Sequence, residues 1–562
     1  MSAIFVLLAG LGSMALGYFF YSRFIAEKIY RLDPDFVTPA RAMEDGVDYV
    51  PTNKFVLWGH HFTSVAGAAP IVGPAIAVIW GWLPAFLWVT LGTVFFAGTH
   101  DAGAIWASVR NRGKSVGALT GEVVSRRART LFMIVIFLVL LMVNAVFAVV
   151  ISNLMVSFPS SVVPVWGAIL VALVIGQLIY RRKANLLIVS VVGVAALYAL
   201  IGIGPVVPIE LPEAALGLSN KALWILILFG YAAIASLLPV WMLLQPRDYI
   251  NGLQLFVGLI ILYGAIIISN PAIVAPAINS NLPAGTPSLL PLLFVTIACG
   301  AISGFHGLVA SGTTSKQLDR ETDLRFVGFF GAVGEGSLAL AAILCATAGF
   351  ASFADWEAVY TAFGAGGVNA FVNGGAYLIS GGIGLDPVVA ATLLTVMAAL
   401  FAGTTMDTGL RLQRYIFQEW GDIYDIGWMK KPLPATLLAV GSCIALAFGA
   451  GGASGSGGMA IWPLFGTTNQ LLAGLTLLII TVMLVRNRRP VWYTLLPLAF
   501  LLVMTLFALL TQLHTFYLQE NWFLLSLDLV VLVAAVFVAL ESASALSRNH
   551  RDIAGGAHEA DR

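Results

Sequence analysis

Long apolar runs separated by short polar segments extend along the whole chain. Fifteen of these runs are long enough to cross about 30 Å of hydrocarbon as helices. Their predicted bounds are 2–24, 57–79, 85–107, 131–152, 164–180, 185–204, 222–244, 251–269, 289–312, 326–351, 386–408, 433–450, 459–485, 491–512 and 522–541. The pattern predicts an all-α polytopic membrane protein.

The composition supports this fold class and excludes others. Of the 562 residues, 59% are hydrophobic and 10% are charged, whereas a soluble protein carries roughly 25% charged residues. Mean hydropathy is +0.93. The 29 Lys and Arg residues nearly balance the 28 Asp and Glu residues, so no broad basic surface for nucleic acid is expected.

The distribution of basic residues predicts an orientation. Cytoplasmic loops of membrane proteins concentrate Lys and Arg. All 29 basic residues except Lys221 fall in or beside one alternating set of segments. The set comprises 25–56, 108–130, 181–184, 245–250, 313–325, 409–432, 486–490 and 542–562. The N-terminus is therefore expected outside and the C-terminus inside, with membrane lipid around the spans.

Two spans carry glycine and proline near their middle. Such residues free backbone groups that lipid cannot satisfy, so interrupted helices persist where they line a cavity walled by protein. The sequence predicts breaks in VAGAAPIVGP (65–74) and in FGYAAIASLLP (229–239). They lie five spans apart and cross in opposite directions, which is typical of an inverted repeat with its site at the breaks. Close helix packing through small residues is the alternative.

The second half of the ninth span, ISGFHGLVASGTTSKQ (302–317), is rich in small and hydroxyl residues and is expected to face the same cavity. The predicted substrate-binding residues are Gly67, Ala68, Ala69, Pro70, Gly73, Gly230, Tyr231, Ser236, Gly304 and His306. No Lys or Arg lies deep in the predicted spans. Backbone N–H groups at the two breaks are therefore expected to supply the positive potential for an anionic substrate.

Ionisable side chains inside a membrane are functional candidates. Asp101, Glu335 and Asp407 are the predicted coupling residues. Glu335 lies roughly 14 Å into its span, where desolvation penalises an ionised carboxyl group. Two roles are open for Glu335: it binds and releases a proton, or it is a neutral residue that makes a structural hydrogen bond to a neighbouring helix.

A cluster of His and Asp at similar depth allows a metal alternative. The candidate ligands are His61, His100, Asp101 and His306, and zinc accepts imidazole and carboxylate. No compact ligand motif such as HExxH supports the cluster. A proton relay, or ordinary hydrogen-bonded histidines, explains the same residues.

Several long motifs resemble the carbon starvation protein A family of bacterial transporters. They are GHHFTSVAGAAPIVGPAIAVIWGWLPA from Gly59, GTHDAG from Gly98, LLQPRDYIN from Leu243, SGFHGLVASGTTSKQ from Ser303, FAGTTMDTGLRLQRY from Phe401 and WPLFGTTNQLLA from Trp462. The resemblance implies uptake of pyruvate or small peptides across the bacterial inner membrane during nutrient limitation. It also implies a fold similar to the amino acid-polyamine-organocation superfamily.

With that fold, the predicted organisation has five parts. Residues 1–56 form a peripheral helix and loop, 57–204 the first repeat, 222–408 the second repeat with a re-entrant outer segment near 366–384, 433–541 peripheral helices and 542–562 a cytoplasmic tail.

The predicted function is secondary active transport by alternating access, without enzymatic activity. Protons are favoured as the coupling ion. Sodium is the alternative, held by carbonyls of 66–69 and hydroxyls of Ser311, Thr313 and Thr314. An intramembrane metalloenzyme and a nutrient sensor are the rival functions.

Overall fold

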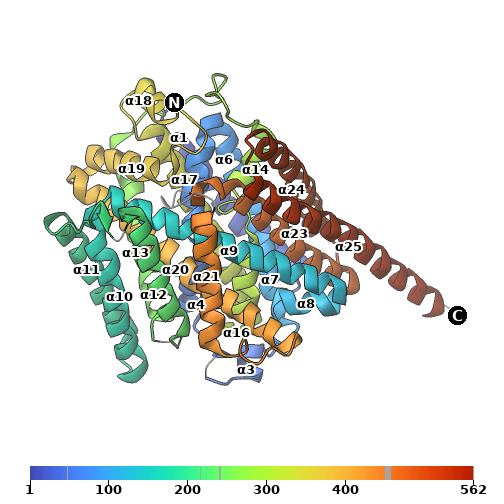
Figure 1. Ribbon diagram of the computed structural model, residues 1–562. Coiled ribbons are helices and arrows are strands. Elements are labelled where there is room, and N and C mark those ends of the chain that lie inside the picture. Colours follow the sequence, from blue (N-terminus) through green and yellow to red (C-terminus); the bar gives the residue numbers. More distant parts are fainter. Residues whose placement is uncertain (47, 216, 240–241, 450–456, 561–562) are drawn as a thin grey trace.

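The computed structural model describes residues 1–46, 48–215, 217–239, 242–449 and 457–560, and almost all of this chain is helical (Figure 1). Within those residues, thirteen helices are long and apolar enough to cross a membrane, and one bent pair brings the number to 14. Two short strands, β1 (Ala214–Ala215) and β2 (Leu218–Ser219), pair antiparallel. The predicted fold class is confirmed.

The helices are the following. The first half of the chain holds α1 (Ala3–Leu16), α2 (Ser22–Phe24), α3 (Pro39–Ala42), α4 (Lys54–Ala66), α5 (Ala69–Ala77), α6 (Trp82–Leu91), α7 (Gly98–Val109), α8 (Val116–Val123), α9 (Arg126–Ser157), α10 (Val162–Gly176), α11 (Leu186–Ile203), α12 (Asn220–Leu237) and α13 (Leu244–Ser269). The second half holds α14 (Leu289–Thr296), α15 (Gly304–Val309), α16 (Ser315–Gln317), α17 (Phe330–Ala348), α18 (Phe353–Val359), α19 (Gly367–Ile383), α20 (Pro387–Ile423), α21 (Pro432–Gly449), α22 (Gly457–Ala460), α23 (Trp462–Arg486), α24 (Trp492–Leu518) and α25 (Trp522–Ala560).

The connecting segments gather on two opposite faces. The face with segments 25–56, 108–130, 313–325 and 409–432 is called the basic face. There the N–H of Thr52 donates to the carbonyl of Gln317 over 3.0 Å. On the other face the N–H of Ala3 donates to the carbonyl of Pro271 over 2.9 Å. In Figure 1, α3 and α16 lie at the basic face and the N-terminus and α18 at the opposite one.

A buried carboxylate joins three segments of the basic face. Glu321 is fully buried and accepts from Arg110 Nε over 2.6 Å, from Arg110 Nη2 over 2.7 Å and from the N–H of Asp33 over 2.7 Å. Hydrogen bonds to charged groups contribute about 1.5–3 kcal/mol each. Glu321→Gln is therefore expected to lower the free energy of unfolding by at least about 1.5 kcal/mol, measured as a fall in melting temperature of the purified protein in detergent.

Asp319→Asn is the matched control for that measurement. Asp319 pairs with Arg41 on the same face, but the Arg41 side chain is 53% exposed, and water screens such pairs. The Arg41 guanidinium, through its hydrogen bond and charge, lowers the pKa of Asp319. Equal melting temperatures for the two variants would contradict the structural role of Glu321.

The break predicted in the second span is confirmed. Helix α4 ends at Ala66 and α5 begins at Ala69, with a bend of 46° between them. Gly67 has a φ of +56°, a conformation that glycine adopts without steric cost. Pro70 lies in the first turn of α5, where proline removes no helical hydrogen bond.

The break predicted at 229–239 is wrong. Helix α12 is continuous from Asn220 to Leu237, and Gly230 is exposed on its surface. A single glycine costs a helix only about 1 kcal/mol, which tertiary packing overrides. Pro239 follows the last helical residues, where proline commonly marks a helix end.

The second interruption lies instead in the predicted ninth span. Helix α14 ends at Thr296 and α15 begins at Gly304, so 289–312 is no continuous helix. Gly300, within the break, has a φ of +93°. The α4–α5 pair starts at the basic face and the α14–α15 pair starts at the opposite face, so the two interrupted helices are antiparallel.

The segment predicted to be re-entrant is helical. It forms α19, between the end of α17 and the start of α20. The N–H of Val274, in the loop of the opposite face, donates to the carbonyl of Thr347 near the end of α17 over 3.0 Å. Helices α18 and α19 thus connect on the face opposite the basic one.

Candidate functional site

The two interrupted helices pack against each other inside the protein. A Cβ atom on Gly73 would lie 2.4 Å from the carbonyl oxygen of Thr296. A Cβ atom on Gly300 would lie 2.8 Å from Cβ of Ala339 and 3.4 Å from Cα of Pro70. Glycine is required at both positions, because the neighbouring atoms leave no room there for a side chain. Ala68, Ala69 and Pro70 are buried as well.

Four side chains form a continuous row beside these breaks, the carboxylate–histidine chain of His100, Asp101, His306 and Glu335. His100 Nδ1 lies 2.7 Å from Asp101 Oδ1, and His306 Nδ1 lies 2.9 Å from Asp101 Oδ2. His306 Nε2 lies 3.1 Å from Glu335 Oε2. Each of the four is at most 1% exposed. Helices α7, α15 and α17 supply them.

The carboxylate–histidine chain ends at one of the breaks. The N–H of Gly300 donates to Glu335 Oε1 over 3.1 Å. Carboxyl and imidazole groups can both give and accept protons. The two histidine contacts of Asp101 are hydrogen bonds, whereas His306 Nε2 and Glu335 are within ion-pair distance without hydrogen-bond geometry. Protonation of Glu335 weakens the hydrogen bond from the Gly300 amide, because a neutral carboxyl oxygen is a weaker acceptor than a carboxylate. The protonation state of Glu335 is thus connected to the backbone of the break.

The metal alternative has no support in this geometry. His61 Nδ1 lies 2.9 Å from the hydroxyl of Thr314, and both oxygens of Asp101 already face histidines. Among the described residues, no group of three or more His, Cys, Asp and Glu side chains is arranged to hold a metal ion.

A second buried group, the arginine cluster, consists of His60, Tyr231, Arg247, Asp248 and Asp407. Arg247 contacts Asp407 through Nη1 and donates from Nη2 to Asp248 over 3.1 Å. The Tyr231 hydroxyl lies 2.8 Å from both Asp407 Oδ2 and Arg247 Nη1. His60 Nδ1 lies 3.2 Å from Asp248 Oδ2. Asp407 is therefore separate from Asp101 and Glu335, with which the sequence had grouped it.

The sequence-based analysis missed Arg247. It placed 245–250 in a cytoplasmic connection, whereas α13 begins at Leu244 and Arg247 lies in its first turn, 2% exposed. The expectation that no buried cation serves the spans is therefore wrong. The adjacent opposite charges of Arg247 and Asp248, directly before a long apolar run, were the available signal.

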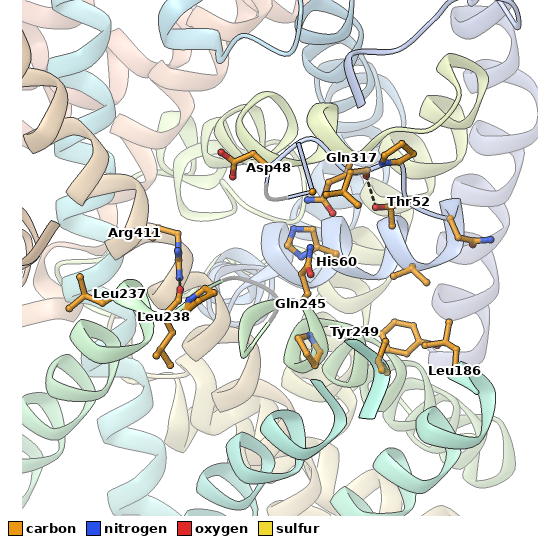
Figure 2. A pocket seen from close by; sticks show the side chains of 18 of the residues that line it. Asp48, Thr52, His60, Leu186, Leu237, Leu238, Gln245, Tyr249, Gln317 and Arg411 are labelled. Carbon is orange, nitrogen blue, oxygen red and sulfur yellow. Dashed lines mark hydrogen bonds between the residues drawn. The ribbon is translucent and has the colours of Figure 1, made fainter. Parts of the chain in front are cut away.

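A cavity of about 910 Å³ reaches from the basic face to His60 (Figure 2). Figure 2 shows His60 between Gln317 and Thr52 on one side and Tyr249 on the other, with Arg411 further along the wall. A second cavity of about 460 Å³ shares part of this lining. The shared residues are Asp48, His60, Gln245, Gln317, Arg411 and Tyr415.

Cationic side chains also line the wall of the larger cavity. Arg411 donates to the carbonyls of Ala235 and Leu238 over 3.0 and 2.7 Å, and Arg414 donates to the carbonyl of Ser236 over 2.8 Å. These bonds cap the C-terminal end of α12, where carbonyls lack helical partners. The region predicted as a break is thus a capped helix end beside the cavity.

Three predicted substrate-binding residues, Gly230, Gly304 and Ser236, do not form part of the two breaks. A Cβ atom on Gly230 would meet nothing within 4 Å, and Gly304 packs against Asn469 and Ala473 of α23. The Ser236 hydroxyl donates to the carbonyl of Ala233 over 3.0 Å within α12. Tyr231 belongs to the arginine cluster and His306 to the carboxylate–histidine chain.

Two of the hydroxyls considered for sodium make hydrogen bonds: the Thr314 hydroxyl lies 2.9 Å from His61 Nδ1, and the Ser311 hydroxyl donates to the carbonyl of Gly307 over 2.7 Å. A further hydroxyl oxygen, Thr405 Oγ1, lies beside the first break, 2.8 Å from where a Cβ on Gly67 would be. Sodium as the coupling ion stays a prediction.

Known proteins are similar in sequence to this chain over most of its length. A peptide transporter CstA of Campylobacter jejuni is 32% identical over 90% of this chain and 80% of its own length. A pyruvate/proton symporter BtsT of Escherichia coli is 32% identical over 90% and 81%. A peptide transporter CstA of Bacillus subtilis is 33% identical over 95% and 97%.

The sequence profile described as carbon starvation protein CstA matches residues 2–352 and 350–508. The match covers both interrupted helices, the carboxylate–histidine chain and the arginine cluster. This multi-pass membrane protein belongs to the carbon starvation protein CstA family.

Proposed function

We propose that this chain is a proton-coupled secondary transporter that takes up pyruvate or small peptides by alternating access. The observation that carries the proposal is a cavity that opens at one face and ends at a buried ionic cluster, with two antiparallel interrupted helices in the same core. The names of the relatives supply the substrate candidates. Among the described residues, no comparable feature supports an enzymatic or sensory role.

The packing supports an inverted repeat with revised limits. Helices α4–α5 and α14–α15 each contain a glycine at positive φ in the break. The α4–α5 pair is followed by the long helix Trp82–Val109 and later by α9. The α14–α15 pair is followed by the long helix Glu321–Ala348 and later by α20. Helices α9 and α20 pack on each other. The second repeat in this proposal begins at α14, and not at 222. Opposed movements of the two repeats would open the cavity alternately to each face.

The basic face is the cytoplasmic face in this proposal, because nearly all Lys and Arg residues gather there. The structure then represents an inward-open arrangement. Substrate arriving from outside reaches the arginine cluster when the opposite face opens, and leaves through the 910 Å³ cavity.

Uptake by proteoliposomes tests the function. With an inward proton gradient and no sodium, the purified chain is expected to accumulate labelled pyruvate or a labelled dipeptide above its external concentration, and a protonophore is expected to stop accumulation. Competition by keto acids and by di- and tripeptides identifies the substrate. Strict sodium dependence, with no response to the proton gradient, would contradict proton coupling.

A further inference from the structure

The arginine cluster contains two carboxylates for one guanidinium. Asp248 contacts Arg247, His60 and, through the Ser64 hydroxyl at 3.3 Å, a neutral donor. Among the described residues, the ion pair of Asp407 is with Arg247 alone. Asp407 thus depends on this single cation, whereas Asp248 has a second partner in His60.

Two polar atoms of the arginine cluster lack hydrogen-bond partners among the described residues. Arg247 Nε and Asp407 Oδ1 are buried and have no hydrogen-bond partner in the described chain. A small cavity of about 30 Å³ touches Arg247, Tyr231 and Gly403. Gln245, Pro246 and Tyr249, the residues on either side of Arg247 in α13, line the large cavity. Arg247 itself is 2% exposed and lies in the chain between residues that form the wall of that cavity.

We propose that Asp407 and the carboxylate of the transported solute compete for Arg247, so that each carboxylate bound there makes Asp407 take up one proton. This inference rests on the proposed transport function and deepens it. It assigns Arg247 as the carboxylate-binding residue and places proton coupling at the same site.

Charge balance explains why binding of a carboxylate at Arg247 is linked to proton uptake by Asp407. A solute carboxylate adds one negative charge to a group that is closed off from water. If it replaces Asp407 at Arg247, Asp407 is left as a buried anion without a cation, a state that is very costly. One proton from the adjoining solution binds to the Asp407 carboxylate and restores the charge of the site. When the solute leaves, Arg247 pairs again with Asp407 and the proton is released to the same side as the solute.

The other groups facing Asp407 leave it as the proton acceptor. Tyr231 on α12 and Arg247 and Asp248 on α13 are its titratable neighbours, and His60 on α4 lies beyond Asp248. Helices α9 and α10 contribute Ile151 and Trp166 to the small cavity at Arg247. A bound carboxylate removes the cation from Asp407 first, because Asp248 keeps its contact with His60.

Proton uptake on binding tests the proposal directly. Purified wild-type protein in weakly buffered detergent solution is mixed with pyruvate or a dipeptide, and a pH indicator dye reports protons bound per ligand. We expect about one proton per carboxylate bound. Pyruvamide and the amidated dipeptide lack the carboxylate, so they are expected to cause no uptake.

Three variants assign the residues. Asp407→Asn is expected to bind the carboxylate at least as tightly as the wild type, with no proton uptake and no proton-driven accumulation. Arg247→Gln is expected to bind about 100-fold more weakly or worse. The double variant Arg247→Gln with Asp407→Asn removes the carboxylate that the single Arg247 change would leave without a cation, and Asp248 keeps its contact with His60. It therefore separates loss of binding from loss of folding. Asp528→Asn, a buried carboxyl on α25, is the control and is expected to match the wild type.

Two results would overturn the inference while leaving the transport function intact. One is wild-type proton uptake by Asp407→Asn, above all if Glu335→Gln abolishes it, because the proton then belongs to the carboxylate–histidine chain. The other is undiminished carboxylate binding by the double variant. Failure of the wild type to transport either substrate in proteoliposomes contradicts the proposed function itself.

Discussion

Gly73→Val is expected to abolish transport, because the added side chain cannot fit where α5 meets α14. The first added atom alone would lie 2.4 Å from the Thr296 carbonyl oxygen and 3.3 Å from Cα of Ile297. Both are backbone positions that cannot rotate away, so the two interrupted helices must separate. Overpacking of this kind costs about 1–3 kcal/mol. Uptake by proteoliposomes and the melting temperature in detergent measure the effect.

Gly230→Val is the matched control. Gly230 is also a helical glycine in a membrane span, but its Cβ would meet open space. The variant is expected to keep wild-type uptake and stability. A loss of uptake at Gly230 equal to that at Gly73 would mean that α12 is a substrate-binding element after all, as the sequence-based analysis expected.

His306→Gln is expected to have the second large effect. His306 lies between the Asp101 and Glu335 carboxylates, all three fully or almost fully buried. Without the imidazole, two buried carboxyl groups lose their shared partner. Breaking a buried ion pair on one side costs about 3–5 kcal/mol. The yield of folded protein and its melting temperature are expected to fall, together with uptake.

A second substitution separates folding from transport at this position. Adding Glu335→Gln to His306→Gln removes one of the stranded carboxylates, so stability is expected to recover in part. Uptake is expected to remain lost, because no titratable group then connects Asp101 with the Gly300 amide. His514→Gln, at an exposed position of α24, controls for the change of residue type. Full uptake by the double variant would show that the chain is only structural.

In the proposed transport mechanism, the positions of the two buried groups suit them to different parts. The arginine cluster lies next to the cavity, where the proposal places the solute. The carboxylate–histidine chain lies against the break at Gly300, where the proposal places the movement of the backbone. Among the described residues no hydrogen bond connects the two groups, although His60 and His61 are neighbours on α4.

The sequence by itself determined the membrane architecture, because hydrophobicity, helix length and loop charge are local properties. The apolar runs and the break at Gly67 follow from residues within one span, although fifteen spans were predicted and the described residues form 13 or 14. The identification of Asp101, His306 and Glu335 as buried ionisable groups follows in the same way, since each lies within a predicted apolar span. The predicted orientation stays a prediction.

Only the tertiary structure decided which of these residues meet. Glycine and proline mark places where a helix can break, but packing decides where it does, so Gly230 stays helical while Gly300 does not. Arg247 follows the same principle. Its sequence neighbourhood is that of a loop, but Tyr231 of α12 and Asp407 of α20 bring a hydroxyl and a carboxylate to it from other parts of the chain, beside the adjacent Asp248. Such partners allow a cation to be buried.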